Sequence, residues 1–220
     1  YVEGYISNKK KLQKIEFKYK GSNPMNWLFD QKEIRYKLKK KKIKNKIRYY
    51  DYRTSQSKII NDYIYFKLAK KILKGSYDVK LVEVFLNNQS KGIYIERNPL
   101  NESFLRRNKF MPVNLYKGEN YRYDDKLIGL ENNLFHNAGL WQKISILNSM
   151  EVDDFSDLEN FLNLIRESNE NDDKMAELLD FNNLENFSNF GAFQILTQAI
   201  VVDYDHNLRI IIDPWSGQKH

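Results

Sequence analysis

The chain has 220 residues, of which 41% are hydrophobic and 14% aromatic, and it carries a formal net charge of +7. A chain of this length and composition can bury a substantial core, which excludes an intrinsically disordered protein. It contains no cysteine, which excludes disulfides, thiolate metal sites and cysteine nucleophiles.

Charge is distributed unevenly along the chain. The stretch from Lys9 to Arg48 is rich in lysine, whereas residues 151–185 are mostly acidic. This asymmetry predicts two lobes or two faces of opposite charge. The net positive charge suits an anionic partner such as a nucleotide, a nucleic acid or an anionic surface.

Membrane and targeting segments are not visible in the sequence. No apolar run approaches the roughly 20 residues that a membrane span needs, and no signal peptide is recognisable. The chain opens at Tyr1 inside a predicted strand and without an initiator methionine, so we expect a fragment or a processed chain.

The first residues predict antiparallel strands. Residues 1–20 alternate between apolar and polar side chains on both sides of a polar turn, which is typical of a hairpin with one wet face. Residues 32–38 place Ile34, Tyr36 and Leu38 on one face. A lysine-rich run follows, and residues 47–52 predict a further strand.

The middle of the chain predicts a helix, a hairpin and a short helix. Residues 57–74 have a wide apolar face at helical spacing and are followed by Gly75, a helix stop. Residues 79–95 form two apolar runs around a turn at residues 87–92, which indicates a hairpin. After it, Pro99 suits the first turn of a short helix that contains Phe104 and Leu105.

The second half of the chain is predicted to be mainly helical. Residues 113–117 read as a buried strand, and residues 153–168 as a helix with one apolar face. Helical spacing continues at 174–179, and residues 180–198 carry an aromatic and aliphatic stripe that we interpret as core. Residues 208–212 predict a final strand.

Several of these segments match one known family in order. Residues 82–94 have the pattern V-x-V-x-L-N-x-x-x-x-G-I-Y, followed by an acidic position and by Phe104-Leu105. This pattern resembles the CotH kinase-like family, atypical protein kinases related to a spore coat protein. Residues 32–38 are similar to the family strand K-x-[YF]-R-[IV]-K-L, and residues 113–117 to its G-x-L-Y-K strand.

The resemblance implies an α+β, two-lobed, protein-kinase-like fold. Residues 1–118 would form a β-rich nucleotide-binding lobe with one helix. Residues 119–220 would form a mainly helical lobe with a segment like the kinase catalytic loop. In the strand at residues 113–117, Tyr116 and Lys117 could line a cleft, although a buried strand is the simpler interpretation.

The resemblance also implies a role for cations of the strand at residues 32–38. By analogy with kinases, a cation that projects from such a strand contacts the phosphates of ATP. Lys37 is the first candidate and Arg35, on the same face, the second. Asp62, the one acid of the predicted helix 57–74, is a candidate partner for Lys37. The alternative is a solvated basic strand face and an ordinary surface acid.

Glu96 is the candidate acid beside the nucleotide. Relatives carry one or two Glu residues a few positions beyond the hairpin glycine, and Glu96 stands four after Gly92. The position of the further Glu is occupied by Asn98, and the His of some relatives by Pro99. Either Glu96 acts from a neighbouring register, or this branch has lost part of the site.

The last segment is similar to the family pattern D-x-x-x-N followed by [DN]-P-x-[ST]-G, which it matches at Asp203, Asn207, Asp213, Pro214 and Gly217. The resemblance implies that Asp203 is the base or the carboxylate that orients the substrate, and that Asn207 binds the Mg²⁺ of the nucleotide. In relatives the next strand ends in P-[IV]-x-x-D and supplies a metal-binding acid. The chain stops at His220, before that strand, so we expect it to be truncated.

Two functions follow from the resemblance. The first is an atypical protein kinase that uses ATP and Mg²⁺ on a protein substrate, possible substrates being surface or coat proteins outside the cytoplasm. The second is a catalytically inactive member of the fold that serves as a surface or binding module. Nucleic-acid binding by the lysine-rich third is disfavoured, because those cations share strands with core positions and no nucleic-acid motif is present. His136 has no His or acid three or four residues away, which argues against a metal site there.

Overall fold

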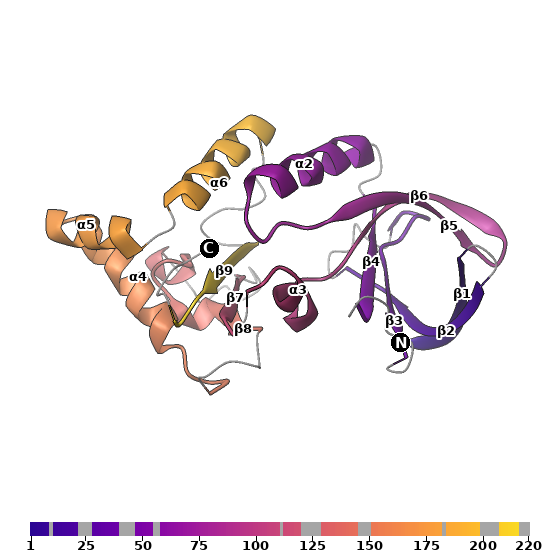
Figure 1. Cartoon of the computed structure of the whole chain (residues 1–220), viewed down its shortest axis with the longest axis horizontal. Coiled ribbons are helices and arrows are strands. Elements are labelled where there is room, and N and C mark those ends of the chain that lie inside the picture. Colours follow the sequence, from indigo (N-terminus) through magenta and orange to yellow (C-terminus); the bar gives the residue numbers. More distant parts are fainter. Residues whose placement is uncertain are drawn as a thin grey trace. The chain divides into compact units, whose positions relative to one another are not determined.

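A computed structural model of the chain describes residues 1–8, 11–21, 28–39, 47–54, 58–110, 112–119, 129–144, 151–181, 184–198 and 207–215. The protein is α+β, as predicted, with a curled β-sheet and separate helices (Figure 1). The chain divides into two compact units. Unit 1 comprises Tyr1–Lys71 and Gly75–Arg107, and unit 2 comprises Ile72–Lys74 and Asn108–His220. The lobe boundary expected at residue 118 stays a prediction.

Unit 1 is built on a six-stranded antiparallel sheet with the strand order β1-β2-β3-β4-β6-β5. Both predicted hairpins are confirmed as neighbouring pairs in this sheet, β1 with β2 and β5 with β6. The strands are β1 (Val2–Asn8), β2 (Lys11–Tyr19), β3 (Ile34–Leu38), β4 (Tyr49–Arg53), β5 (Val79–Leu86) and β6 (Gln89–Arg97).

The turn between β5 and β6 is shorter than the predicted turn at residues 87–92. Asn87 and Asn88 alone form it, with φ angles of 51° and 63°. Two consecutive positive φ angles match the twist of the flanking strands and favour asparagine. The predicted turn residue Gly92 therefore lies inside β6, with a φ of 89°. A Cβ at Gly92 would lie 3.1 Å from the amide nitrogen of Gln31, which donates to the Ile93 carbonyl.

One face of the sheet forms the core of unit 1, and the predicted alternation in β3 is confirmed. Ile34, Tyr36 and Leu38 are buried, and the residues between them are half-buried. Aliphatic and aromatic side chains of the neighbouring strands pack on this face, namely Ile6, Ile15, Phe17, Tyr50 and Tyr52. Since the strands alternate, the opposite face of β3 and β4 carries polar residues, whereas on β5 and β6 that face also carries the buried Val79 and Ile95.

Two helices belong largely to this part of the chain, α2 (Ile59–Ile72) and α3 (Glu102–Arg107). The helix predicted over residues 57–74 is confirmed as α2, but its apolar face is only partly covered, because Ile60 and Ile64 are exposed and Ala69 is its one buried residue. In α3, Phe104 and Leu105 are buried as core residues. The Asn101 side chain caps this helix by accepting from the Phe104 N–H, so Pro99 precedes the helix and does not lie in its first turn.

Unit 2 contains a three-stranded antiparallel sheet with the order β8-β7-β9. Its strands are β7 (Asn114–Gly118), β8 (Trp141–Lys143) and β9 (Leu208–Ile212), and it also contains the 3-10 turns η3 (Gly129–Asn132) and η4 (Ala138–Leu140) and the helices α4 (Ser156–Ser168), α5 (Asp172–Phe181) and α6 (Leu184–Thr197). The predicted strands at β7 and β9 are confirmed. Strand β8 was not predicted, because three residues carry no periodic signal.

The core of unit 2 is formed by this sheet and α4. It contains Tyr116, Leu134, Trp141, Leu158, Phe161, Leu162, Ile210 and Ile212. The apolar face predicted for α4 is thus confirmed. Asp154 lies just before this helix and accepts from the Ser156 N–H at 2.9 Å. Tyr116 is fully buried, so β7 is the buried strand of the simpler interpretation.

The core role predicted for the apolar stripe of α6 is wrong for several of its residues. Ile195 is 83% exposed, and Leu184, Phe187 and Leu196 are exposed as well. Periodicity identified the helix correctly but not its burial, since burial depends on which elements pack against a face. No helix in the described part of the chain has the length and apolar character needed to cross a membrane, which agrees with the sequence.

A buried polar cluster joins β7 to α4. The Tyr116 hydroxyl donates to one carboxylate oxygen of Asp157 at 2.5 Å, and the Asn114 amide donates to the other at 2.6 Å. Burial raises the pKa of Tyr116, and the bond to Asp157 raises it further, so the phenol remains a proton donor. This cluster orients the first turn of α4 on the sheet.

We expect Tyr116→Phe to destabilise the protein by about 1–3 kcal/mol, because the substitution deprives a partly buried carboxylate of a hydrogen-bond donor. Urea denaturation followed by circular dichroism measures this loss. Tyr5→Phe is the matched control, since Tyr5 is exposed and its hydroxyl should contribute within about 0.5 kcal/mol. Equal stability of both variants would contradict the role of the cluster.

Candidate functional site

The polar face of the unit 1 sheet gathers charged side chains from three adjacent strands. Arg35 on β3 lies opposite Asp51 on β4, and Asp51 lies opposite Arg97 on β6. Directly opposite residues of antiparallel strands project to the same face. The three side chains therefore form a row across the centre of the sheet, on the face away from the tyrosine core.

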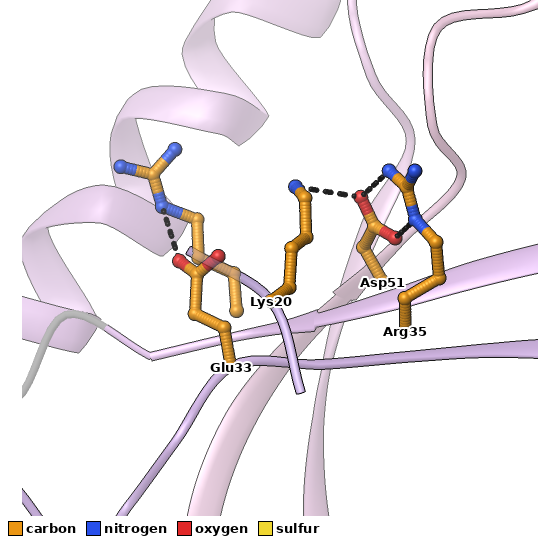
Figure 2. A network of polar contacts seen from close by, with 5 residues as sticks. Lys20, Glu33, Arg35 and Asp51 are labelled. Atoms are coloured by element: carbon orange, nitrogen blue, oxygen red, sulfur yellow. Dashed lines mark hydrogen bonds and ion pairs between the residues drawn. The ribbon is translucent and has the colours of Figure 1, made fainter. Parts of the chain in front are cut away.

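Asp51 is the centre of this face. Its side chain is 3% exposed, and it accepts two hydrogen bonds from Arg35, at 2.5 Å from Nε and 2.8 Å from Nη2. Lys20 donates to the same carboxylate at 3.0 Å (Figure 2). Burial by itself would raise the pKa of Asp51, but the bonds and charges of Arg35 and Lys20 outweigh it and lower the pKa.

Three further cations, Lys20, Arg53 and Arg97, lie around the pair of Asp51 and Arg35. Burial lowers the pKa of Lys20, and the charge of Arg97 lowers it further against the opposing effect of Asp51. Burial also lowers the pKa of Arg53, with Arg97 again adding to the effect. Arg53 Nε lies 3.7 Å from a carboxylate oxygen of Glu33, the second acid shown in Figure 2. The face as a whole is therefore cationic.

Lys37, the first candidate for the phosphates, lies on this face but engages a different acid from the predicted one. Its ammonium group is 2.7 Å from Glu16, which is directly opposite on β2. It also lies 4.5 Å from the centroid of the Tyr1 ring. Asp62, the predicted partner, instead lies near enough to Arg53 for its charge to oppose the lowering of the Arg53 pKa by burial. The pairing of Lys37 with Asp62 is therefore replaced by cross-strand pairing.

Glu96 lies on the opposite face of the sheet from Arg35 and Lys37. It is directly opposite Tyr52, which shares a face with the buried Tyr36. Its carboxylate is 2.9 Å from Lys80, and its charge helps burial to raise the pKa of Tyr52. The structure thus brings Arg35 and Lys37 together but does not bring Glu96 to them.

The candidates near the end of the chain lie in unit 2. Asn207 directly precedes β9 and has a φ of 64°, a left-handed conformation that asparagine tolerates better than most residues. Asp213 directly follows β9 and accepts from the Trp215 N–H at 2.9 Å. Asp203 and Gly217 lie outside the described residues. Within the ranges that the structure describes, no three His, Cys, Asp or Glu residues are grouped to hold a metal ion.

Lys117, named with Tyr116 as a possible cleft residue, takes part in a local ion pair. Its ammonium group lies 3.2 Å from Glu119, which also lies 3.8 Å from Arg209 on β9. These contacts are between residues of adjacent strands and the loop that follows. They account for the position of Lys117 without a ligand.

Sequence reasoning missed four residues of the charged face, namely Lys20, Asp51, Arg53 and Arg97. A signal was present in β4, where an acid and an arginine alternate with three tyrosines in the sequence YYDYR. Alternation of this kind places Asp51 and Arg53 on one face and Tyr50 and Tyr52 on the other. The position of Arg97 beside them depends on the pairing of β4 with β6, which no local pattern predicts.

Comparison with known proteins gives one finding beyond the geometry. The family model described as CotH kinase protein matches residues 30–216. The matched range contains the charged strands β3 and β4, the central hairpin and the segment around Asn207. A search of curated proteins found no match.

We expect Asp51→Asn to destabilise the protein by about 3 kcal/mol, because it leaves Arg35 and Lys20 partly buried without their carboxylate. The unfolding free energy in urea measures the loss. Glu3→Gln is the matched control, since Glu3 pairs with Lys14 in an exposed position, where solvent screens the pair and its loss should change the stability little. Comparable losses in the two variants would contradict a special role for Asp51.

The pairing of Asp51 with Arg35 and Lys20 also predicts that the stability depends on pH. The folded pKa of Asp51 is lowered, so its stabilisation is complete above its unfolded pKa of about 3.9 and is lost as the pH falls through the folded value. The stability difference between the wild type and Asp51→Asn should therefore shrink below a pH of about 4. Urea denaturation of both proteins at neutral and acidic pH measures it. A constant difference over the range would contradict the lowered pKa.

Proposed function

The chain belongs to the CotH kinase protein family, and we propose on this premise that it is an atypical protein kinase that transfers a phosphoryl group from ATP to a protein. The observation that carries the proposal is the family match over residues 30–216, which spans both units. A cationic sheet face in unit 1 supports it, because phosphoryl transfer depends mainly on positioning and on neutralising phosphate charge.

In the proposed reaction a hydroxyl oxygen of the protein substrate attacks the γ-phosphorus of ATP. The bond from that phosphorus to the bridging oxygen breaks, and ADP leaves. Asp203 accepts the hydroxyl proton or orients the hydroxyl. Bound Mg²⁺ supplies neutralisation of the phosphate charge, and the side-chain oxygen of Asn207 is a ligand of the hard type that this ion prefers.

Lys37 and Arg35 are the proposed phosphate contacts in unit 1. Both are exposed enough to reach a ligand, since the side chains of Lys37 and Arg35 are 20% and 25% exposed. Each already has a carboxylate partner, Glu16 for Lys37 and Asp51 for Arg35. These partners fix the two cations in position, which reduces the conformational entropy that ligand binding would otherwise cost.

A specific observation favours a second candidate function, an inactive member of the family that serves as a surface or binding module. Glu96 faces away from Arg35 and Lys37, and Asn98 occupies the position of the further family Glu. A site that lacks these family Glu residues would bind an anionic ligand without turning it over. Activity measurements separate the two functions.

We expect the chain to bind ATP in the presence of Mg²⁺ and to transfer phosphate to a protein. Isothermal titration calorimetry measures the binding, and transfer of labelled phosphate measures the activity. Lys37→Ala should weaken ATP binding about tenfold, and Asn207→Gly should remove the Mg²⁺-dependent part of it. Glycine is chosen at 207 because it retains the positive φ without strain.

Two matched controls accompany these variants. Lys14→Ala removes a lysine that pairs with Glu3 at 2.7 Å, the same distance as in the pair of Lys37 and Glu16. Asn88→Gly removes an asparagine with a φ of 63° from the hairpin turn. Neither control should change ATP binding.

Absence of ATP binding in the wild type would contradict the kinase proposal, and binding without phosphate transfer would favour the inactive module.

A further inference from the structure

The charged face of unit 1 carries more positive charge than its acids neutralise. Its cations are Lys20, Arg35, Arg53 and Arg97, whereas Asp51 and Glu33 are the acids in ion-pair contact with them. Asp51 is already shared by Arg35 and Lys20. Arg53 has Glu33 at 3.7 Å, whereas Arg97 has no acid in ion-pair contact in the described part of the chain, so the cation without an acid is Arg97.

Arg97 is held in place by aromatic rings. Its guanidinium carbon lies 4.8 Å from the centroid of Tyr77 and 5.7 Å from that of Phe66 on α2. Among the described residues it has no carboxylate within ion-pair distance. An arginine stacked in this way is rigid, and the edge of its guanidinium stays available for hydrogen bonds.

Two donors on this face lack acceptors. The Nε atoms of Arg53 and of Arg97 are both buried from solvent without a hydrogen-bond partner in the described structure. A buried donor without a partner costs about 1–3 kcal/mol, and more when the group is charged. The two donors belong to positively charged groups that lie near each other, because the charge of Arg97 lowers the pKa of Arg53. An anion that accepts from both would remove this cost.

The geometry points to a binding site for a phosphate group formed by Arg53 and Arg97, with Lys20 beside them. A phosphate group suits the site because guanidinium groups donate pairs of hydrogen bonds to its oxygens, whereas a single carboxylate or halide could serve fewer of these donors. Arg53 comes from β4 and Arg97 from β6, adjacent strands with a shared face, so the site needs no rearrangement of the sheet.

This site differs from the one suggested by the family pattern, which names Lys37 and Arg35. Arg35 is occupied by a bidentate pair with Asp51, and Lys37 lies toward β2. The anion site itself stands on the contacts above. That its phosphate belongs to a nucleotide rests on the proposed function; a phosphorylated side chain or free phosphate would offer the same chemistry.

The test uses the whole chain with three probes, inorganic phosphate, tripolyphosphate and ATP with Mg²⁺, in calorimetric titrations at fixed ionic strength. Arg53→Gln and Arg97→Gln should each weaken tripolyphosphate binding at least about tenfold. Arg106→Gln is the matched control, because it makes the same charge change at an exposed position of α3. It should leave the affinity unchanged.

Arg97→Lys keeps the charge but removes the Nε donor, and it replaces Arg97→Gln as the test variant if that protein fails to fold. It should still weaken tripolyphosphate binding several-fold. Equal affinities in the wild type, both Gln variants and Arg97→Lys would overturn the site, as would no binding of inorganic phosphate or tripolyphosphate to the wild type.

The three probes separate this inference from the proposed function. Tripolyphosphate binding that depends on Arg53 and Arg97, without ATP binding, would support the anion site and overturn its assignment to a nucleotide. ATP binding that depends on Asn207 but not on Arg53 or Arg97 would support the kinase proposal and overturn the anion site. Loss of all three probes in the Gln variants would support a shared site for nucleotide and free phosphate.

Discussion

The buried carboxylate of Asp51 is the interaction on which the arrangement of unit 1 depends. It is 3% exposed and joins Lys20, after β2, and Arg35 on β3 to its own strand, β4. Without it, two cations on the polar face would lack their acid, a state that costs several kcal/mol. The same strand faces the core with Tyr50 and Tyr52. At β3 and β4 the sheet is thus held by packed tyrosines on one face, where Tyr36 stacks on Tyr50, and by charge pairing on the other.

This division of the sheet also bears on function. Cations that bind a phosphate must be kept rigid. Arg35 is held by its pair with Asp51, whereas Arg97 is held by its stacking on Tyr77 and lacks an acid within ion-pair distance in the described structure. The face therefore contains cations that are held in two different ways, one by an acid and one by aromatic rings. Glu96, on the tyrosine face, belongs to neither.

The elements were largely predictable because their signals are local. Alternation identified β1, β2 and β3, helical spacing identified α4, and two apolar runs around turn residues identified the central hairpin. Predictions of burial were less successful. The apolar stripes of α2 and α6 are partly exposed, because periodicity defines a face but not what packs against it. Strand β8 escaped prediction because it exists only through its pairing with β7.

For the candidate site, the sequence alone determined the fold class, the family, and the shared face of Arg35 and Lys37, since each follows from local spacing or an ordered series of motifs. Tertiary structure alone decided the partners. Strand register placed Glu16 opposite Lys37, Asp51 between Arg35 and Arg97, and Glu96 on the other face. The physical reason is that pairing between strands joins residues far apart in the chain, and a one-residue change of register would turn each side chain to the opposite face.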